Sequence, residues 1–188
     1  MKDDAQLIHD ALEGDSSAFG LLVRKYQDRL FNTLVHVTGG REEAEDLVQD
    51  AFVQAFVKLH TFQAQSAFYT WLYRIAFNLA ISRKRRKRPE VSVESRQEAT
   101  GMEPMDRAES VSERMLREER GHQIQAALAS LTEEHRSILV LREIDGCCYE
   151  TIGEILDLPV GTVRSRLHRA RLQLRDELKE VLADNPTD

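Results

Sequence analysis

Apolar residues recur every three or four positions along most of the chain, and no stretch shows strand-like alternation bounded by hairpin turns. The spacing predicts a short helix over 4–13, a longer one from about 16 to Gly39, a third over 41–59 and a fourth from about 67. Asp15 or Ser16 is expected to cap the second helix. The predicted fold class is therefore all-α.

The helical pattern stops after residue 88. Residues 89–110 lack aromatic side chains and mix Glu, Ser, Pro and Gly, which is typical of a flexible segment. We therefore predict two small helical domains, at 1–88 and 118–183, joined by a flexible acidic linker at 89–117. Two further helices are expected before Gly146, the second of them starting after Thr132.

Residues 149–178 predict two helices joined by a tight turn at Asp157-Leu158-Pro159. Pro159 suits the first position of the second helix, because its missing N–H would have no intrahelical partner there. Gly153 has no side chain and would let the two helices approach closely. This arrangement predicts a helix-turn-helix.

The second helix of this pair has a dry side and a cationic side. Its inward stripe is Val163, Leu167, Ala170 and Leu174, and its outward face is Arg164, Ser165, His168 and Arg169, with Arg166 and Arg171 on the flanks. Arginine can bond guanine edges in the major groove, so the pattern favours DNA reading. The alternative is a solvated arginine-rich surface helix.

The fourth helix combines aromatic residues with cations. Its predicted buried stripe is Phe68, Leu72, Ile75, Ala76 and Leu79, while Trp71, Arg74 and Asn78 lie on another side, Tyr69 and Tyr73 add rings, and a basic tract follows at 83–88. Rings that stack on unpaired bases, beside arginines that follow phosphates, are typical of a single-strand site. The rings could equally complete a small core.

The chain has 188 residues, of which 41% are hydrophobic and 31% charged, and its formal net charge is -6. A free-standing DNA binder usually carries a basic excess, so an acidic chain with two basic patches suggests that a partner assists DNA binding. The acidic, amphipathic start is no signal peptide and no apolar run would span a membrane, which indicates the cytoplasm. Neighbouring Cys147 and Cys148 read as reduced residues, with a redox role a minor alternative.

Two other classes of protein compete with the interpretation as a DNA-binding protein that acts with a partner. A helix-turn-helix repressor or activator would bind its operator as a dimer. It would not need the acidic and amide-rich face that Asp46, Gln49 and Asp50 give the third helix. An enzyme would need a phosphate loop, a metal-spaced His/Cys cluster or a nucleophile with its base, and none of these motifs occurs. We therefore expect no catalytic residues, cofactor or metal.

The order of these features resembles a bacterial RNA polymerase sigma factor of the extracytoplasmic-function (ECF) type in the sigma-70 family. Three segments carry the resemblance, which covers nearly the whole chain: AEDLVQDAFVQAF at 44–56, SAFYTWLYRIAFNLA at 66–80 and PVGTVRSRLHRAR at 159–171. The resemblance implies a region 2 helical bundle, a region 4 helix-turn-helix, and promoter-specific transcription initiation.

The resemblance also implies roles for individual residues. The polar face of the third helix, which periodicity alone would leave to solvent, would bind the clamp coiled coil of the largest polymerase subunit through Asp46, Leu47, Gln49 and Asp50. The upstream promoter element would be read by Arg164, Ser165, Arg166, His168, Arg169 and Arg171. The downstream element would be captured, with a flipped base, by Phe62, Ser66, Phe68, Trp71, Arg74, Asn78, Arg83, Lys84, Arg85 and Arg86.

Three departures from the family pattern are visible. Gln63-Ala64-Gln65 stands where an Arg-Gly-acid triplet is common, and Cys147-Cys148 stands where a small or polar pair is usual. We also expect no appended domain after Leu182. By analogy, signal sensing is expected to lie on an anti-sigma factor.

Overall fold

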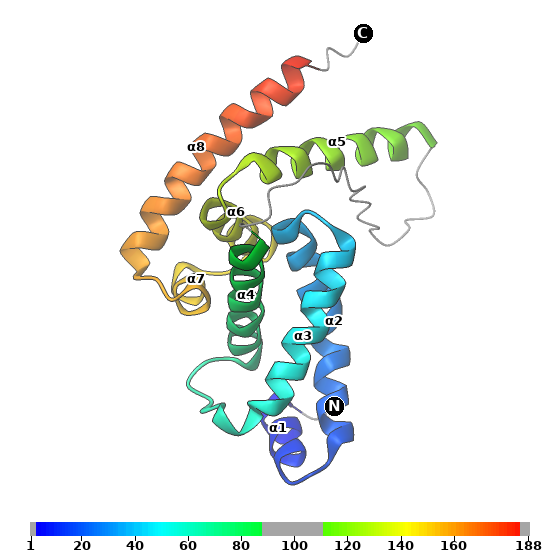
Figure 1. The fold of residues 1–188 in the computed structure, drawn as a ribbon, viewed down its shortest axis with the longest axis vertical. Coiled ribbons are helices and arrows are strands. Elements are labelled where there is room, and N and C mark those ends of the chain that lie inside the picture. Colours follow the sequence, from blue (N-terminus) through cyan, green and yellow to red (C-terminus); the bar gives the residue numbers. More distant parts are fainter. Residues whose placement is uncertain (1–2, 88–110, 185–188) are drawn as a thin grey trace.

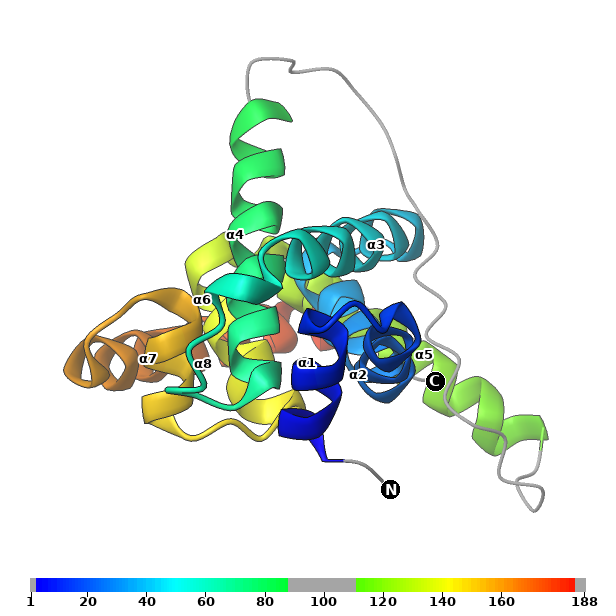
Figure 2. The ribbon, with the colours of Figure 1, turned by 90° about the horizontal axis from the view of Figure 1, so that it is seen from below.

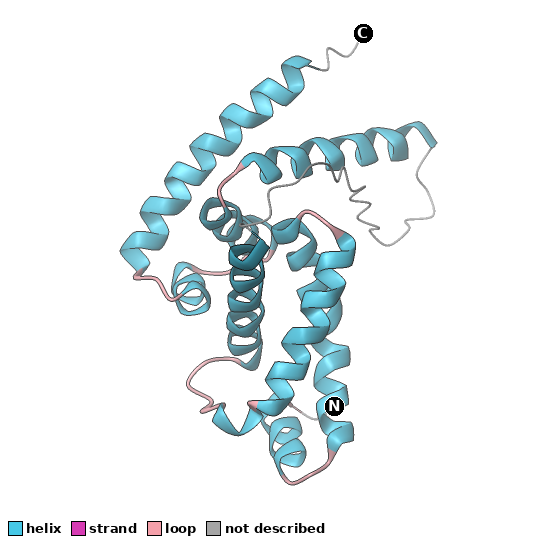
Figure 3. Cartoon of the chain, in the orientation of Figure 1, coloured by secondary structure: helices cyan, strands magenta, loops and turns pink. Residues whose placement is uncertain are grey.

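The computed structural model describes residues 3–87 and 111–184, and every regular element within them is a helix (Figure 3). The all-α prediction is confirmed. The elements of the first domain are α1 (Asp4–Leu12), α2 (Ser16–Thr38), α3 (Arg41–Val57), the short 3-10 turn η1 (Leu59–Thr61) and α4 (Phe68–Lys87). Those of the second are α5 (Val111–Ser130), α6 (Glu133–Leu139), the π-helical turn η2 (Val140–Ile144), α7 (Tyr149–Leu156) and α8 (Val160–Asp184).

Side-chain caps and glycines set the helix ends of the first domain. Asp3 accepts from the main-chain N–H of Gln6 to begin α1, and Asp15, rather than Ser16, caps α2 through the N–H of Ser17 at 2.9 Å. Gly39 ends α2 in the left-handed region at a φ of 85°, where a residue without a Cβ meets no steric penalty. The predicted boundaries hold to within two residues.

The first domain is built on α2, α3 and α4, which lie side by side (Figure 1). Its core is made of helix-spaced apolar side chains that are completely buried, among them Leu22, Leu30, Leu34, Leu47 and Leu72. The predicted stripe of α4 holds in part: Ile75 and Leu79 are only half-buried, whereas Tyr73 and Phe77 are fully buried. These two rings are buried because α4 is covered on a second side, by α7.

In the second domain, α5 begins at Val111, so residues 111–117, which the composition assigned to the linker, are helical. Thr132 caps α6 as expected, accepting from the N–H of His135. The helix expected to continue to Gly146 widens into the π-turn η2, and Gly146 follows with a φ of 70°. A π-turn is rare in helices and is often found at functional sites.

The helix-turn-helix forms from α7 and α8 as predicted, with a difference at Pro159. The carbonyl of Pro159 accepts from the N–H of Val163, so the proline lies one residue before the first turn of α8. A Cβ on Gly153 would lie 2.7 Å from the carbonyl oxygen of Leu158. Gly153 is therefore needed for close approach to the turn itself, and Asp157 completes the turn in the left-handed region.

The two domains pack against each other in this structure. Helix α7 lies on α4, and the buried apolar residues of both domains form one continuous core. Arg136 of α6 is almost completely buried, and its guanidinium donates to the carbonyls of Leu128, Ala129 and Leu131 and, across the domain boundary, to that of Val37. This one side chain thus serves the C-terminal carbonyls of both α5 and α2.

Candidate nucleic-acid interface

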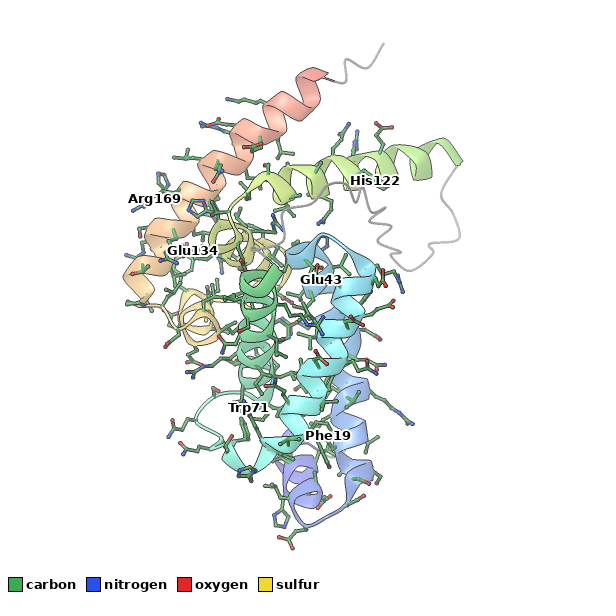
Figure 4. The ribbon with its side chains drawn as sticks, viewed as in Figure 1. Phe19, Glu43, Trp71, His122, Glu134 and Arg169 are labelled. Carbon is green, nitrogen blue, oxygen red and sulfur yellow. The ribbon has the colours of Figure 1, made fainter. Side chains whose placement is uncertain are left out.

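Helix α8 presents a polar front on a dry back, as its sequence predicts. Val163, Leu167 and Ala170 are buried in the second domain, which anchors the helix on its inner side, whereas Leu174 at the end of the predicted stripe is only half-buried. The front residues Arg164, Ser165, His168 and Arg169 are all exposed, and Arg169 points away from the body of the molecule (Figure 4). Four side chains able to donate hydrogen bonds from one helical face are suited to base edges and phosphates in a major groove.

The flanking arginines of α8 differ from the front ones. Arg166 Nη1 lies 3.0 Å from Glu134 Oε2, and Arg171 Nη2 lies 2.6 Å from Glu143 Oε1. Both guanidiniums are therefore engaged by acids of their own domain. Their assignment to the upstream element stays a prediction, and they would have to exchange a carboxylate for a phosphate on binding.

A cluster of rings lies where the loop after η1 meets the start of α4. Trp71 packs between Phe62 and Phe68, at ring-centroid distances of 5.4 and 5.7 Å, and Phe68 also contacts Tyr26. Phe68 is buried, whereas Phe62 and Trp71 keep part of their surface exposed. Figure 4 shows Trp71 near the loop end of α4. Trp71 is thus part of a small core and also keeps an accessible face, and its role in binding single strands stays a prediction.

Further polar residues continue this surface along α4. Arg74 and Asn78 are exposed one and two turns beyond Trp71, and Ser66 is half-exposed in the loop. The loop needs Ala64 in the left-handed region, at a φ of 54°. Rings with an adjacent guanidinium and amide can stack on and hydrogen-bond an unstacked base.

The basic tract lies on the last turns of α4, which extend beyond the neighbouring helices (Figure 2). Arg83 is directed back to α3, where Nη1 lies 3.6 Å from Asp46 Oδ2 and Nη2 donates to Asp50. The side chains of Lys84, Arg85 and Arg86 lie outside the described residues. Arg83 therefore neutralises part of the acidic face of α3.

The face of α3 predicted to bind polymerase carries Asp46, Gln49 and Asp50 at or near the surface. Leu47 is fully buried, so its side chain lies in the core and is not part of this surface. Val53 and Val57 continue the same face and are exposed, at 59% and 65%. An acidic and amide-bearing helix face that ends in apolar side chains is suited to a protein partner.

Sequence reasoning missed residues at the contact between the domains. Arg29, Thr33 and Tyr73 of the first domain surround the carboxylate of Asp145 from the second. The only local signal is the spacing of Tyr69 and Tyr73, which puts two polar-tipped rings on one face of α4. Their partners are more than seventy positions away in sequence.

Within the described ranges, no group of His, Cys, Asp and Glu side chains could hold a metal ion. Over the same ranges, no helix is long and apolar enough to cross a membrane.

The fold defines a protein of the helix-turn-helix class, with a second exposed surface that is aromatic and basic. The family model described as Sigma-70 region 2 matches residues 22–90, and that described as Sigma-70, region 4 matches residues 121–174. The RNA polymerase sigma-H factor of Pseudomonas aeruginosa is 38% identical over 188 residues, covering 97% of each chain. The ECF RNA polymerase sigma factor SigW of Bacillus subtilis is 36% identical over 181 residues, covering 93% of this chain and 96% of its own.

Two solved structures share the fold. The sigma factor RpoE of Bartonella quintana, in complex with the anti-sigma factor NepR, superposes with a TM-score of 0.67 at 26% identity and covers 86% of this chain and 96% of its own. CnrH, in complex with the cytosolic domain of CnrY, gives a TM-score of 0.69 at 26% identity, covering 94% and 97%. The chain belongs to the sigma-70 family of RNA polymerase sigma factors, within the ECF group, as its sequence motifs indicate.

Proposed function

We propose that this sigma factor binds the clamp coiled coil of the largest subunit of core RNA polymerase through Asp46, Gln49 and Asp50 of α3. It reads the upstream promoter element with the front of α8 and captures unstacked bases of the downstream element with the aromatic surface of α4. The observation that carries the proposal is the segregation on α8 of an exposed cationic front from a fully buried back.

The mechanism uses binding energy and no bond chemistry. Contacts from α8 set the register of the complex on duplex DNA. Bases that leave the stack are then held by Trp71 and its neighbours, and because the site binds only unstacked bases, it shifts the duplex toward the open state. A protein acting in this way is not an enzyme.

The charge distribution explains why polymerase would be required. The net charge is -6, and three cations of the reading surfaces, Arg83, Arg166 and Arg171, are paired with carboxylates. Polymerase contact at Asp46 and Asp50 would compete with their pairing to Arg83 and release that guanidinium to promoter phosphates. Core binding and DNA binding would thus be coupled through one arginine.

Control by an anti-sigma factor is proposed by analogy, since the structurally similar RpoE was solved in complex with one. This arrangement is suited to a stress or envelope response, in which the signal is sensed by the partner. Because the sigma factor acts with the polymerase, we place it in the cytoplasm.

The test mixes the purified chain with core polymerase that lacks any sigma factor. We expect co-elution and transcription from discrete start sites on genomic fragments. A variant with Asp46→Asn, Gln49→Ala and Asp50→Asn should lose co-elution, while Arg175→Ala, on an exposed turn of α8, should keep it. Operator binding by the chain alone as a dimer, without core association, would favour a conventional repressor instead.

Sequence reading by α8 is tested separately. Arg164→Ala should cost about 1–3 kcal/mol of promoter binding and relax the preference at one upstream base pair. Equal weakening on every sequence would make Arg164 a phosphate contact. A panel of upstream variants assayed with the reconstituted holoenzyme separates these outcomes.

A further inference from the structure

A buried carboxylate of the second domain is held entirely by side chains of the first. The side chain of Asp145 is 4% exposed. Arg29 Nε donates to its Oδ1 at 3.0 Å, and Thr33 Oγ1 donates to its Oδ2 at 2.6 Å. The hydroxyl of Tyr73 lies 3.3 Å from Oδ1 and 3.1 Å from Thr33 Oγ1. Arg29 also donates from Nη2 to the main-chain oxygen of Asp145, so it binds both the side chain and the backbone of this residue.

Further contacts between the two domains lie on both sides of Asp145. The Arg29 guanidinium lies over the ring of Tyr69, 5.1 Å from its centroid, and the Tyr69 hydroxyl is 4.0 Å from Cys147 Sγ. Farther along α2, His36 Nδ1 lies 3.0 Å from Gln125 Oε1 of α5. The domain contact is therefore polar at its centre, and Asp145 is the residue with the most cross-domain bonds in it.

Local backbone geometry presents Asp145 to the first domain. It follows directly on the π-turn η2, and its N–H donates to the carbonyl of Val140, five residues earlier. Gly146 then turns the chain away in the left-handed region. This uncommon geometry aims one carboxylate out of the second domain, away from its own core.

A buried ionic contact is a poor way to stabilise a permanent interface, since desolvation offsets most of the Coulomb attraction. It suits an interface that opens, because each of its groups can be hydrated again when the domains separate. The sigma activity proposed above needs the two domains on separate promoter elements, whereas here α7 of the upstream reader is fixed on α4 of the downstream reader.

We propose that Asp145 is a conformational latch, which holds the free sigma factor closed through Arg29, Thr33 and Tyr73 and must be released for productive engagement of polymerase and promoter. The domain-closing role stands on the contacts alone. Its consequence for transcription rests on the proposed function.

The test compares the full chain with Asp145→Asn, which keeps the shape and removes the charge, and with Arg29→Ala, which removes the donor from an exposed helix position. Arg24→Ala, at an exposed position of the same helix, is the matched control. Small-angle scattering reports the radius of gyration, about 16 Å for a compact chain of 188 residues. Loss of a charged hydrogen-bond set should shift the closed-to-open ratio about ten- to a hundredfold, and the radius should grow by several ångströms.

Stopped-flow mixing with core polymerase forms the second measurement. If opening precedes binding, the association rate should rise about tenfold for both latch variants and stay unchanged for Arg24→Ala. An unaltered radius of gyration in Asp145→Asn and Arg29→Ala overturns the latch. A larger radius without faster association shows that closure does not limit engagement, which overturns the regulatory claim. Failure of every variant and the parent chain to bind polymerase overturns the proposed function instead, and leaves the scattering result standing.

Discussion

Replacing Arg136 by methionine tests how far one buried cation supports the joint between α5, α6 and α2. The guanidinium is 5% exposed and donates to four main-chain oxygens at 2.6 to 3.2 Å. Methionine preserves most of the apolar stem and removes all of these donors. Burial lowers the pKa of Arg136, which shows that desolvation destabilises its charged form. Replacing the guanidinium by an apolar side chain removes this unfavourable desolvation.

The expected loss follows from these opposing effects. Hydrogen bonds to a charged group contribute about 1.5–3 kcal/mol each, but the four share one guanidinium and are not additive. Removing the guanidinium leaves no charge unpaired, but it leaves buried main-chain oxygens without a donor, at about 1–3 kcal/mol for each such oxygen. After the recovered desolvation cost is subtracted, we expect Arg136→Met to lower the free energy of unfolding by about 3–5 kcal/mol, a large share of the roughly 5–15 kcal/mol of a typical domain.

Urea unfolding followed by circular dichroism measures the change. At a slope of about 2 kcal/mol/M, the midpoint should fall by roughly 2 M. The urea midpoint of Arg136→Lys should lie between those of the parent chain and Arg136→Met, because a compact ammonium keeps the charge but cannot reach all four carbonyls. Arg175→Met, at an exposed position, is the control. A loss below about 1 kcal/mol in Arg136→Met, similar to that of the control, would refute the reasoning.

Three further predictions concern the turn, the cysteines and the domain contact. Gly153→Ala should destabilise the chain by about 1–3 kcal/mol, because its Cβ would lie 2.7 Å from a main-chain carbonyl oxygen. Gly121 has open space around it, so Gly121→Ala should stabilise the chain by about 0.5–1 kcal/mol. Thermal melts measure both changes. Burial, and then the charge of Asp145, raises the pKa of the Cys147 thiol, while Cys148 is exposed. Ellman's reagent should therefore show one fast thiol, lost in Cys148→Ser; two equal fast phases would contradict this. Burial also raises the pKa of Tyr73 above its ordinary value of 10.0, so stability should fall as pH rises past about 10, where only the unfolded phenol ionises, and less steeply in Tyr73→Phe.

The sequence alone determined the features that depend on neighbours along the chain. Helix periodicity located the helices, capping residues and glycines located most of their ends, and the sorting of faces on α8 separated its buried stripe from its exposed front. These predictions succeed because an apolar stripe with a 3.6-residue period has to be buried in any fold that the helix joins. The resemblance to the family then predicted the roles of those faces.

Only the tertiary structure decided how the faces are used between elements. Tyr73 and Phe77 are buried because α7 covers a second side of α4, and Arg83 is partly neutralised because α3 brings Asp46 and Asp50 to it. The pairing of Asp145 with Thr33 spans 112 positions. Hydrogen-bond partners so far apart leave no periodic trace, since a single polar residue fits a solvated surface as well as a buried contact. The contact between the two domains consists of such pairs, and it became visible only in three dimensions.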